Sequence, residues 1–434
     1  MANEALRRYR HARRWTQSQA AERVCAQVQA VTGRDPGLDA NWVSRLERGV
    51  ITWPSSDYRA ALCAVFQVAG EAELGLCPKW SATPGGEPTA EAPADDVGCL
   101  AAEAELSARL ARYAAETNVN SLVLEQFDAD VERLAQSFVS QPLHLTVPEI
   151  RTVRAEAFRL LEGRQHPGQT RHLYVIAGWL CGLAAHAALD LGDRSSAATH
   201  ARTVVQCAKI AEHSGLRSWA RSFQSLAAYW AGDYGRAANL ARAGREAGRG
   251  SGSGTIKARL LSLEARALSA SGDGRDALRA LTLAHEARSI TEPDELSGIF
   301  SFPEAKQWAY TGTTLLTVGG NEQIQRAIVA SNRAVALYQA GPEGDRSPGD
   351  VHAAHLDLAT AYLASGEVEE AGAELSEVLD ADGYTASITI RLRKLAVLLG
   401  SGPYRDAQSV ADLREHIHEV AARPALASHP TEPR

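Results

Sequence analysis

The chain has 434 residues, of which 45% are hydrophobic and 22% are charged. This balance excludes wholesale disorder, and the length exceeds that of one ordinary domain. Aromatic residues make up only 6%, and Ala, Leu and Arg dominate, which favours packed helices over sheets. No run of 18 apolar residues occurs and none follows the charged N-terminus, so neither a membrane span nor a secretory signal is expected. Six scattered cysteines without a CxxC pair favour reduced thiols in the cytoplasm.

The charge is distributed unevenly along the chain. Residues 1–60 carry ten arginines and six acidic residues, whereas the whole chain has a formal net charge of −7. A basic first segment on an otherwise acidic chain indicates that this segment meets a polyanion such as nucleic acid.

Capping residues predict a series of short helices in the first 70 residues. A first helix is expected over residues 3–13. A second begins after Thr16, where Gln19 completes a capping box, and a third opens at Asp39. Gly49 ends the third helix, and the amphipathic segment 57–66 supplies another. The residues CAQVQAVTGRDPGL form an insertion between the second and third helices.

Two segments, LRRYRHARRWTQSQAAERV and NWVSRLERG, together resemble the Cro/C1-type helix-turn-helix of the XRE family of bacterial repressors. The resemblance covers residues 3 to about 70 and implies a five-helix DNA-binding domain, here called the head, over residues 1–80. It departs from phage repressors in the insertion, which is about a dozen residues longer. It also implies that Arg10 and Glu47 form a structural ion pair. The whole arrangement resembles long actinobacterial regulators that join such a head to tetratricopeptide-like (TPR-like) repeats.

The third helix is the expected recognition helix, because such a helix places its N-terminal residues against base edges in the major groove. Asn41 can pair with adenine and Arg45 with guanine, the alternative being a solvated surface helix. Trp42 either contacts thymine methyl groups or packs inward. Gln17, at the start of the second helix, is placed to grip a phosphate. The weaker phosphate candidates are Arg14, Arg48 and Thr52.

A Pro- and Gly-rich segment, residues 81–98, predicts a flexible linker between the head and a helical body over residues 99–423. At the start of the body, Leu106, Leu110 and Tyr113 share one face of an expected helix. Residues 424–434 are expected to form a disordered tail.

The body repeats the pattern Gly-Asp/Glu-x-x-x-Ala after helical stretches. The glycines are 192, 232, 272 and 366, and the wider last gap leaves room for a less regular repeat around Gly319-Gly320. The glycine can end one helix in the left-handed conformation. The following alanine, and a small residue seven positions before each glycine, allow two helices to cross closely. The pattern resembles the tetratricopeptide repeat and predicts an all-α, TPR-like solenoid; a generic helical array is the alternative.

Stacked helical pairs line a concave groove that can take a peptide, a partner protein or a small molecule. Most aromatic residues of the inner helices are expected to pack in the core, and the remainder to face the groove. The candidate effector-binding residues are Trp179, His186, Trp219, Tyr229 and Trp230.

Motifs for catalysis are missing from the sequence. GSGSGTIK (250–257) lacks the spacing of a phosphate loop, and His352 and His355 share a helical face without a third ligand nearby. We therefore expect a non-enzyme without cofactor or metal. The favoured function is a sequence-specific transcription regulator that binds a double-stranded DNA operator as a homodimer and senses an effector through the body. The alternative is a TPR-like protein–protein adaptor with a degenerate head.

Overall fold

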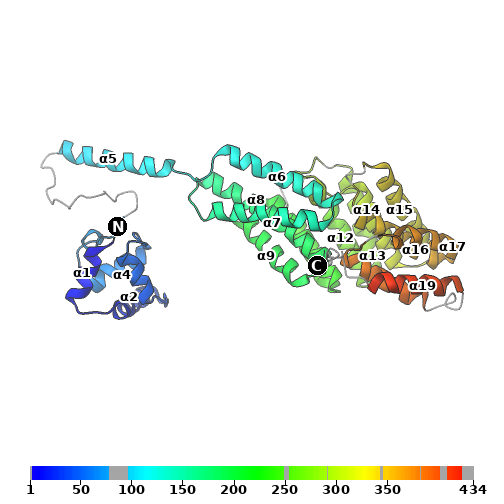
Figure 1. Ribbon diagram of the computed structural model, residues 1–434, viewed down its shortest axis with the longest axis horizontal. Coiled ribbons are helices and arrows are strands. Elements are labelled where there is room, and N and C mark those ends of the chain that lie inside the picture. The colour runs from blue at the N-terminus through cyan, green and yellow to red at the C-terminus, as the bar shows by residue number, and fades with distance from the viewer. Residues whose placement is uncertain are drawn as a thin grey trace, which may run out of the picture. The chain divides into compact units, whose positions relative to one another are not determined.

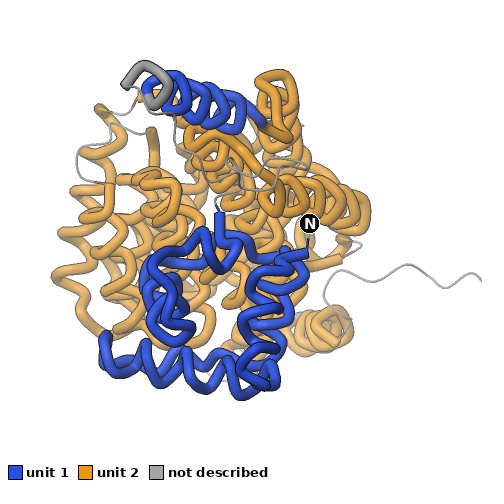
Figure 2. The backbone as a smooth tube through the Cα atoms, turned by 90° about the vertical axis from the view of Figure 1, so that its left-hand side faces the viewer, with its two compact units in different colours: residues 1–116 blue, residues 117–434 orange. Residues whose placement is uncertain are grey.

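The computed structural model describes residues 2–77, 96–248, 254–290, 292–342, 346–381, 383–400 and 408–422. Their regular secondary structure is helical throughout, so the all-α prediction is confirmed (Figure 1). The chain divides into two compact units, residues 1–116 and 117–434 (Figure 2). The predicted tail lies outside the described residues, and so does the predicted linker except for residues 96–98, which begin a helix.

The described part of the head contains four α-helices, and a short 3-10 helix is the fifth element of the expected five-helix domain. Asn3, Thr16 and Asp39 each accept a hydrogen bond from a backbone N–H in the first turn of the helix that follows, and Gln19 completes the predicted capping box. The elements are α1 (Glu4–Ala12), α2 (Gln17–Thr32), α3 (Ala40–Glu47), α4 (Ser56–Phe66) and η1 (Glu71–Leu74). Their buried core includes Leu6, Val24, Leu46, Phe66 and Leu74.

The insertion between the second and third helices lengthens α2 and adds a loop. The helix continues to Thr32, and Gly33 ends it with φ of 72°. Residues 33–39 then lead to α3, and the backbone N–H of Leu38 lies 3.2 Å from the sulfur of Cys25. The tight turn of a short helix-turn-helix is therefore replaced by a longer, locally anchored connection.

Helix α5 (Asp96–Ala115) falls in the first unit, so the observed division after residue 116 differs from the predicted start of the body at residue 99. None of its side chains from Leu100 to Ala115 is buried. Leu106 and Tyr113 are partly exposed and Leu110 is 47% exposed, so the predicted apolar face exists without a covering element in the described part of the unit.

The body is built from consecutive helical pairs that stack along the chain (Figure 1). The pairs are α6 (Ser121–Ser140) with α7 (Leu143–Leu161), α8 (Pro167–Asp190) with α9 (Arg194–Ile210), α10 (Ser214–Trp230) with α11 (Tyr234–Ala247), α12 (Ile256–Ala270) with α13 (Gly274–Arg288), α14 (Glu304–Val318) with α15 (Asn321–Ala340), α16 (Pro348–Ser365) with α17 (Val368–Leu379), and α18 (Ala386–Leu399) with α19 (Gln408–Ala422). A second 3-10 helix, η2 (Gly298–Phe300), lies in the long connection between α13 and α14.

The repeated Gly-Asp/Glu-x-x-x-Ala pattern marks the turn and the close crossing of four helical pairs, as predicted. The four glycines have φ between 82° and 89°, the left-handed region that an L side chain rarely adopts. The alanine five positions later is buried in every copy, as is the small residue seven positions before the glycine. The hydroxyl of Ser225 on α10 donates to the carbonyl of Ala237 on α11 over 2.8 Å, which shows how closely the paired helices approach. Gly319 and Gly320, with φ of 76° and 84°, join α14 to α15 as the irregular repeat.

One helix among the described residues, α8, is long and apolar enough to cross a membrane by length and composition. Of its most apolar window, 78% is buried inside the body. A core helix of a folded domain passes the same test, and α8 contributes Leu173, Ile176, Leu180 and Leu183 to the largest hydrophobic cluster.

Candidate nucleic-acid interface

The expected recognition helix α3 has a buried face and an exposed face. Val43 and Leu46 are buried in the head core, whereas Asn41 and Arg45, one turn apart, are exposed. The carboxylate of Asp39 accepts a hydrogen bond from the N–H of Trp42 over 2.8 Å and fixes the start of the helix. The apolar face thus anchors α3 and leaves Asn41 and Arg45 pointing to solvent.

Trp42 packs partly inward, and its contact with thymine methyl groups stays a prediction. Its side chain is half-buried, and its ring meets the Tyr58 ring edge-on, with centroids 5.7 Å apart. The indole therefore braces α3 against α4.

A buried ion pair connects α1 to the end of α3. Arg10 Nε lies 2.5 Å from Glu47 Oε1, and Nη2 lies 3.1 Å from Oε2, so the structural pair implied by the family resemblance is confirmed. The Gln17 amide donates to the same carboxylate over 2.8 Å. Burial raises the pKa of Glu47, but hydrogen bonds from Arg10 and Gln17, together with the charges of Arg10 and Arg7, hold the pKa below its usual value. The Gln17 side chain is thus engaged within the head, and its phosphate contact stays a prediction.

The remaining phosphate candidates lie near the two ends of the helix-turn-helix. Arg14 is exposed between α1 and α2 and has φ of 54°. Arg48 is exposed at the end of α3, and neither arginine pairs with a carboxylate in the described part of the head. Thr52 is half-buried, and its carbonyl accepts a hydrogen bond from the N–H of Cys77. Arg34, which no sequence motif singles out, is exposed in the loop leading into α3.

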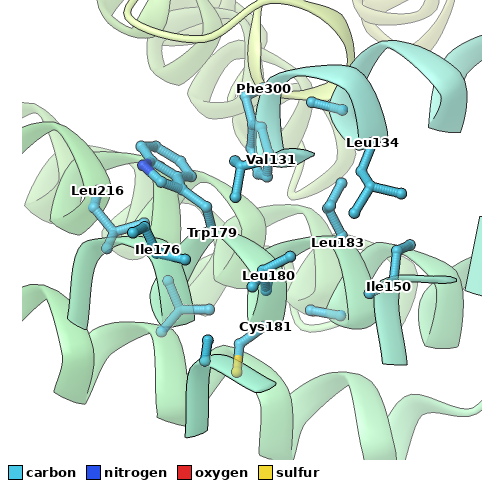
Figure 3. Packing of buried hydrophobic residues seen from close by; sticks show 14 of the residues in the cluster. Val131, Leu134, Ile150, Ile176, Trp179, Leu180, Cys181, Leu183, Leu216 and Phe300 are labelled. Atoms are coloured by element: carbon cyan, nitrogen blue, oxygen red, sulfur yellow. The ribbon is translucent and has the colours of Figure 1, made fainter. Parts of the chain in front are cut away.

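Three of the five candidate effector residues form a closed aromatic cluster in the body. Trp179, His186 and Trp219 are at most 6% exposed. The Phe300 ring lies 4.6 Å from the Trp179 ring and 5.0 Å from the Trp219 ring, centroid to centroid, and Figure 3 shows it in one buried cluster with Trp179 and Val131. Burial lowers the pKa of His186 well below its usual value, so its imidazole is neutral. These rings therefore do not face an open groove, because η2 covers them.

The other two candidates are half-buried. The Arg266 guanidinium lies 4.4 Å from the centroid of the Tyr229 ring. Trp230 lines an open cavity of about 380 Å³ between the turn after α8 and helix α18, together with Arg194 and Arg393. Trp230 thus borders this cavity.

The histidines that shared a helical face have different neighbours. His355 Nδ1 lies 2.6 Å from Glu374, and the His352 ring lies against that of Tyr384. Within the described ranges, no group of three His, Cys, Asp or Glu residues is arranged to hold a metal ion. Of GSGSGTIK, residues 250–253 lie outside the described residues.

Comparison with known proteins identifies the head. A family model described as a helix-turn-helix domain matches residues 4–74. No curated protein matches the chain. Among solved structures, the chain is similar to the crystal structure of BtubC (BKLC) from P. vanneervenii, with 18% sequence identity and a TM-score of 0.39, over 60% of this chain and 94% of that one. The head is thus a helix-turn-helix domain, and it precedes a body of stacked helical pairs.

Proposed function

We propose that the protein is a sequence-specific DNA-binding transcription regulator whose head is of the Cro/C1 (XRE) type. The observation that carries this proposal is the exposed face of α3. Asn41 and Arg45 point outward, while Val43 and Leu46 anchor the helix from behind. An asparagine can make two hydrogen bonds to adenine and an arginine two to guanine, so this face is suited to reading base edges.

The same observation favours a regulator over an adaptor with a degenerate head. Neither Asn41 nor Arg45 makes a side-chain hydrogen bond or ion pair within the described part of the head, so both side chains are available to a partner. Arg10 and Glu47, in contrast, are explained by the scaffold alone. Polar side chains that point outward from α3 are available to base edges, which favours the regulator.

Dimerisation and sensing complete the proposal. The protein acts in the cytoplasm as a homodimer on a pseudo-palindromic operator, as long actinobacterial regulators of this architecture would. The body supplies the dimer interface and binds an effector, which is a peptide, a protein or a small molecule. The protein has no catalytic role and uses no cofactor.

The test is genome-wide mapping of DNA sites bound by the tagged full-length protein and by an Arg45→Ala variant. A regulator gives discrete sites with a shared motif for the parent protein, and these sites disappear in the variant. Arg279→Ala is the matched control, because it removes the same charge from an exposed position on the body. Absence of discrete sites for the parent protein, with partner proteins recovered instead, would favour the adaptor.

A further inference from the structure

Residues 292–302, here called the strap, form most of the long connection between α13 and α14 and reach back to the first helices of the body. Phe300 is the central contact, because it is 6% exposed and sits against the rings of Trp179 on α8 and Trp219 on α10 (Figure 3 shows Phe300 and Trp179). Gly182 of α8 lies directly beneath these rings. A Cβ at this position would come within 2.8 Å of Trp219 and 3.1 Å of Phe300. The absence of a side chain at position 182 therefore makes the room that Phe300 fills.

Polar groups of the body hold the backbone of the strap as they would hold a bound peptide. The Arg259 guanidinium, buried on α12, lies 3.3 Å from the carbonyl oxygen of Ile299 and 3.4 Å from that of Phe300. On α6, the Glu132 carboxylate accepts hydrogen bonds from the hydroxyl and the N–H of Ser297. The contacts to carbonyl oxygens and to the N–H bind a segment largely regardless of its sequence, whereas the Ser297 hydroxyl and a side-chain pocket supply selectivity.

Two acidic residues anchor the first half of the strap. Asp294 accepts hydrogen bonds from the N–H and the hydroxyl of Thr255, at 2.7 Å and 2.8 Å, just before α12 begins. Glu295 lies 3.0 Å from the ring nitrogen of His213, at the start of α10. These contacts lie at the exposed end of the strap, since Glu295 is 47% exposed at its side chain.

The close fit of the strap depends on Gly298. Its φ is 60°, and a Cβ would lie 2.1 Å from the carbonyl oxygen of Ala135 on α6. No side chain fits at this point while the strap remains in place. The strap therefore reaches the aromatic pocket only because it crosses α6 at a glycine.

The pocket beneath the strap has the chemistry of a peptide-binding site. Its wall consists of Trp179, Trp219 and Phe223 with the neutral His186. The indole N–H of Trp219 and the Nε2 of His186 are buried without a hydrogen-bond partner among the described residues. Aromatic walls, buried polar atoms with unmet hydrogen bonds and a cation facing backbone carbonyls together suit an extended peptide that carries one aromatic side chain.

We propose that this pocket is a binding site for an extended peptide with an aromatic side chain, and that the strap occupies it as an internal ligand. A partner peptide then binds by displacing the strap, with its aromatic ring replacing Phe300 and its carbonyl oxygens meeting Arg259. The inference concerns the body alone and does not depend on DNA binding by the head.

The test uses the full-length protein and a fluorescent synthetic peptide of the strap sequence, EPDELSGIFSF. Gly298→Ala removes no apolar group yet forces the strap off α6, so it frees the pocket. Gly272→Ala is the matched control, because Gly272 also has a positive φ but a Cβ there meets nothing within 4 Å. We expect the peptide to bind Gly298→Ala at least about tenfold more tightly than it binds the parent protein or the control, since apparent affinity scales with the open fraction.

A second peptide, with alanine in place of the phenylalanine that corresponds to Phe300, should lose most of this binding. Equal binding of the first peptide to all three proteins, or none to a Gly298→Ala protein that keeps its helical circular dichroism, would overturn the proposal. Hydrogen exchange of the parent protein provides a test that needs no variant. Strap amides that exchange faster than those of α8 and α10 support displacement, and strap amides that exchange only with global unfolding refute it.

Discussion

On α3, neighbouring side chains have different roles: some pack in the head core and others face solvent. Val43 and Leu46 are in the core, and the exposed Arg45 lies between them in sequence. Because the Arg45 side chain makes no hydrogen bond or ion pair among the described residues, its loss should affect DNA binding far more than stability. This separation makes base readout testable at one position.

Arg45→Ala should weaken binding to the operator by about 1–3 kcal/mol, the value of a two-bond contact to guanine. Binding to random DNA should fall far less, because phosphate contacts dominate it. Fluorescence anisotropy at one fixed salt concentration, on operator and random duplexes, measures both. An equal loss on the two duplexes would show that Arg45 contacts phosphate and not a base.

Glu47 illustrates the opposite case of a polar residue that serves the scaffold. Glu47→Gln should lower the free energy of unfolding of the head by about 3–5 kcal/mol, since Arg10 would remain buried without its counter-charge. Hydrogen exchange of the α1–α4 amides in the full chain measures this loss. Arg10→Met combined with Glu47→Leu should restore most of the stability, because no unpaired charge then remains.

The stability lost in Glu47→Gln should depend on pH, because the pKa of Glu47 is lowered in the folded parent protein. Its ionised form stabilises the fold above the unfolded pKa of about 4.3, and that contribution is lost as the pH falls through the lower folded pKa. The difference between the parent protein and Glu47→Gln should therefore be full at pH 7 and shrink below about pH 4. A difference independent of pH would contradict an electrostatic origin.

At the scale of elements, a short local sequence pattern predicts the helical pairs. The glycine and the two small crossing residues lie within about fifteen positions, and the structure shows each of them in all four copies. The acid after the glycine caps the second helix in the first three copies, whereas Glu367 in the fourth makes no side-chain cap. The head helices were equally readable, because capping acts within one turn. The hydrogen bond from Gln17 to Glu47 could not be predicted in this way, because it joins residues 30 positions apart. The strap was missed for the same reason, because Ser297 meets Gln136 across 161 positions and no periodic pattern records such a contact.

The crossing rule predicts a contrast between neighbouring alanines of α9. Ala197→Leu should reduce the free energy of unfolding of the body by about 1–3 kcal/mol, because Ala197 is 1% exposed where α8 crosses α9. Ala198→Leu should change it by less than about 0.5 kcal/mol, since Ala198 is exposed. Urea denaturation followed by circular dichroism gives both values. Similar losses from the two variants would mean that helix crossing does not require the small residue.

At the scale of the whole molecule, charge separates the two parts of the chain. The first 60 residues are net basic and the chain as a whole carries −7, so we expect the head to supply most of the attraction to DNA. One recognition helix reads only a few base pairs, and helix-turn-helix proteins usually gain affinity by binding as dimers.

We therefore predict a homodimer that binds two half-sites about one helical turn apart, with centres roughly 34 Å from each other. Light scattering should give twice the mass of 46.4 kDa for the free protein. Inserting five base pairs between the half-sites should abolish tight binding, because it turns the second site to the opposite side of the duplex. A monomeric mass both in solution and on the operator would contradict the prediction.

The last prediction concerns Asp190, which ends α8 within the electrostatic influence of Lys306 on α14 and Asp350 on α16. Burial raises its pKa to about 7, and Lys306 only partly offsets this. A folded pKa above the unfolded value means that folding takes up a proton between about pH 4 and pH 7, so stability falls as the pH rises through this range. Asp190→Asn removes that dependence. Its stability relative to the parent protein should therefore grow between about pH 4 and pH 7 and stay constant above, in urea titrations at each pH. A relative stability that does not change with pH would show that Asp190 is ionised throughout in the folded body.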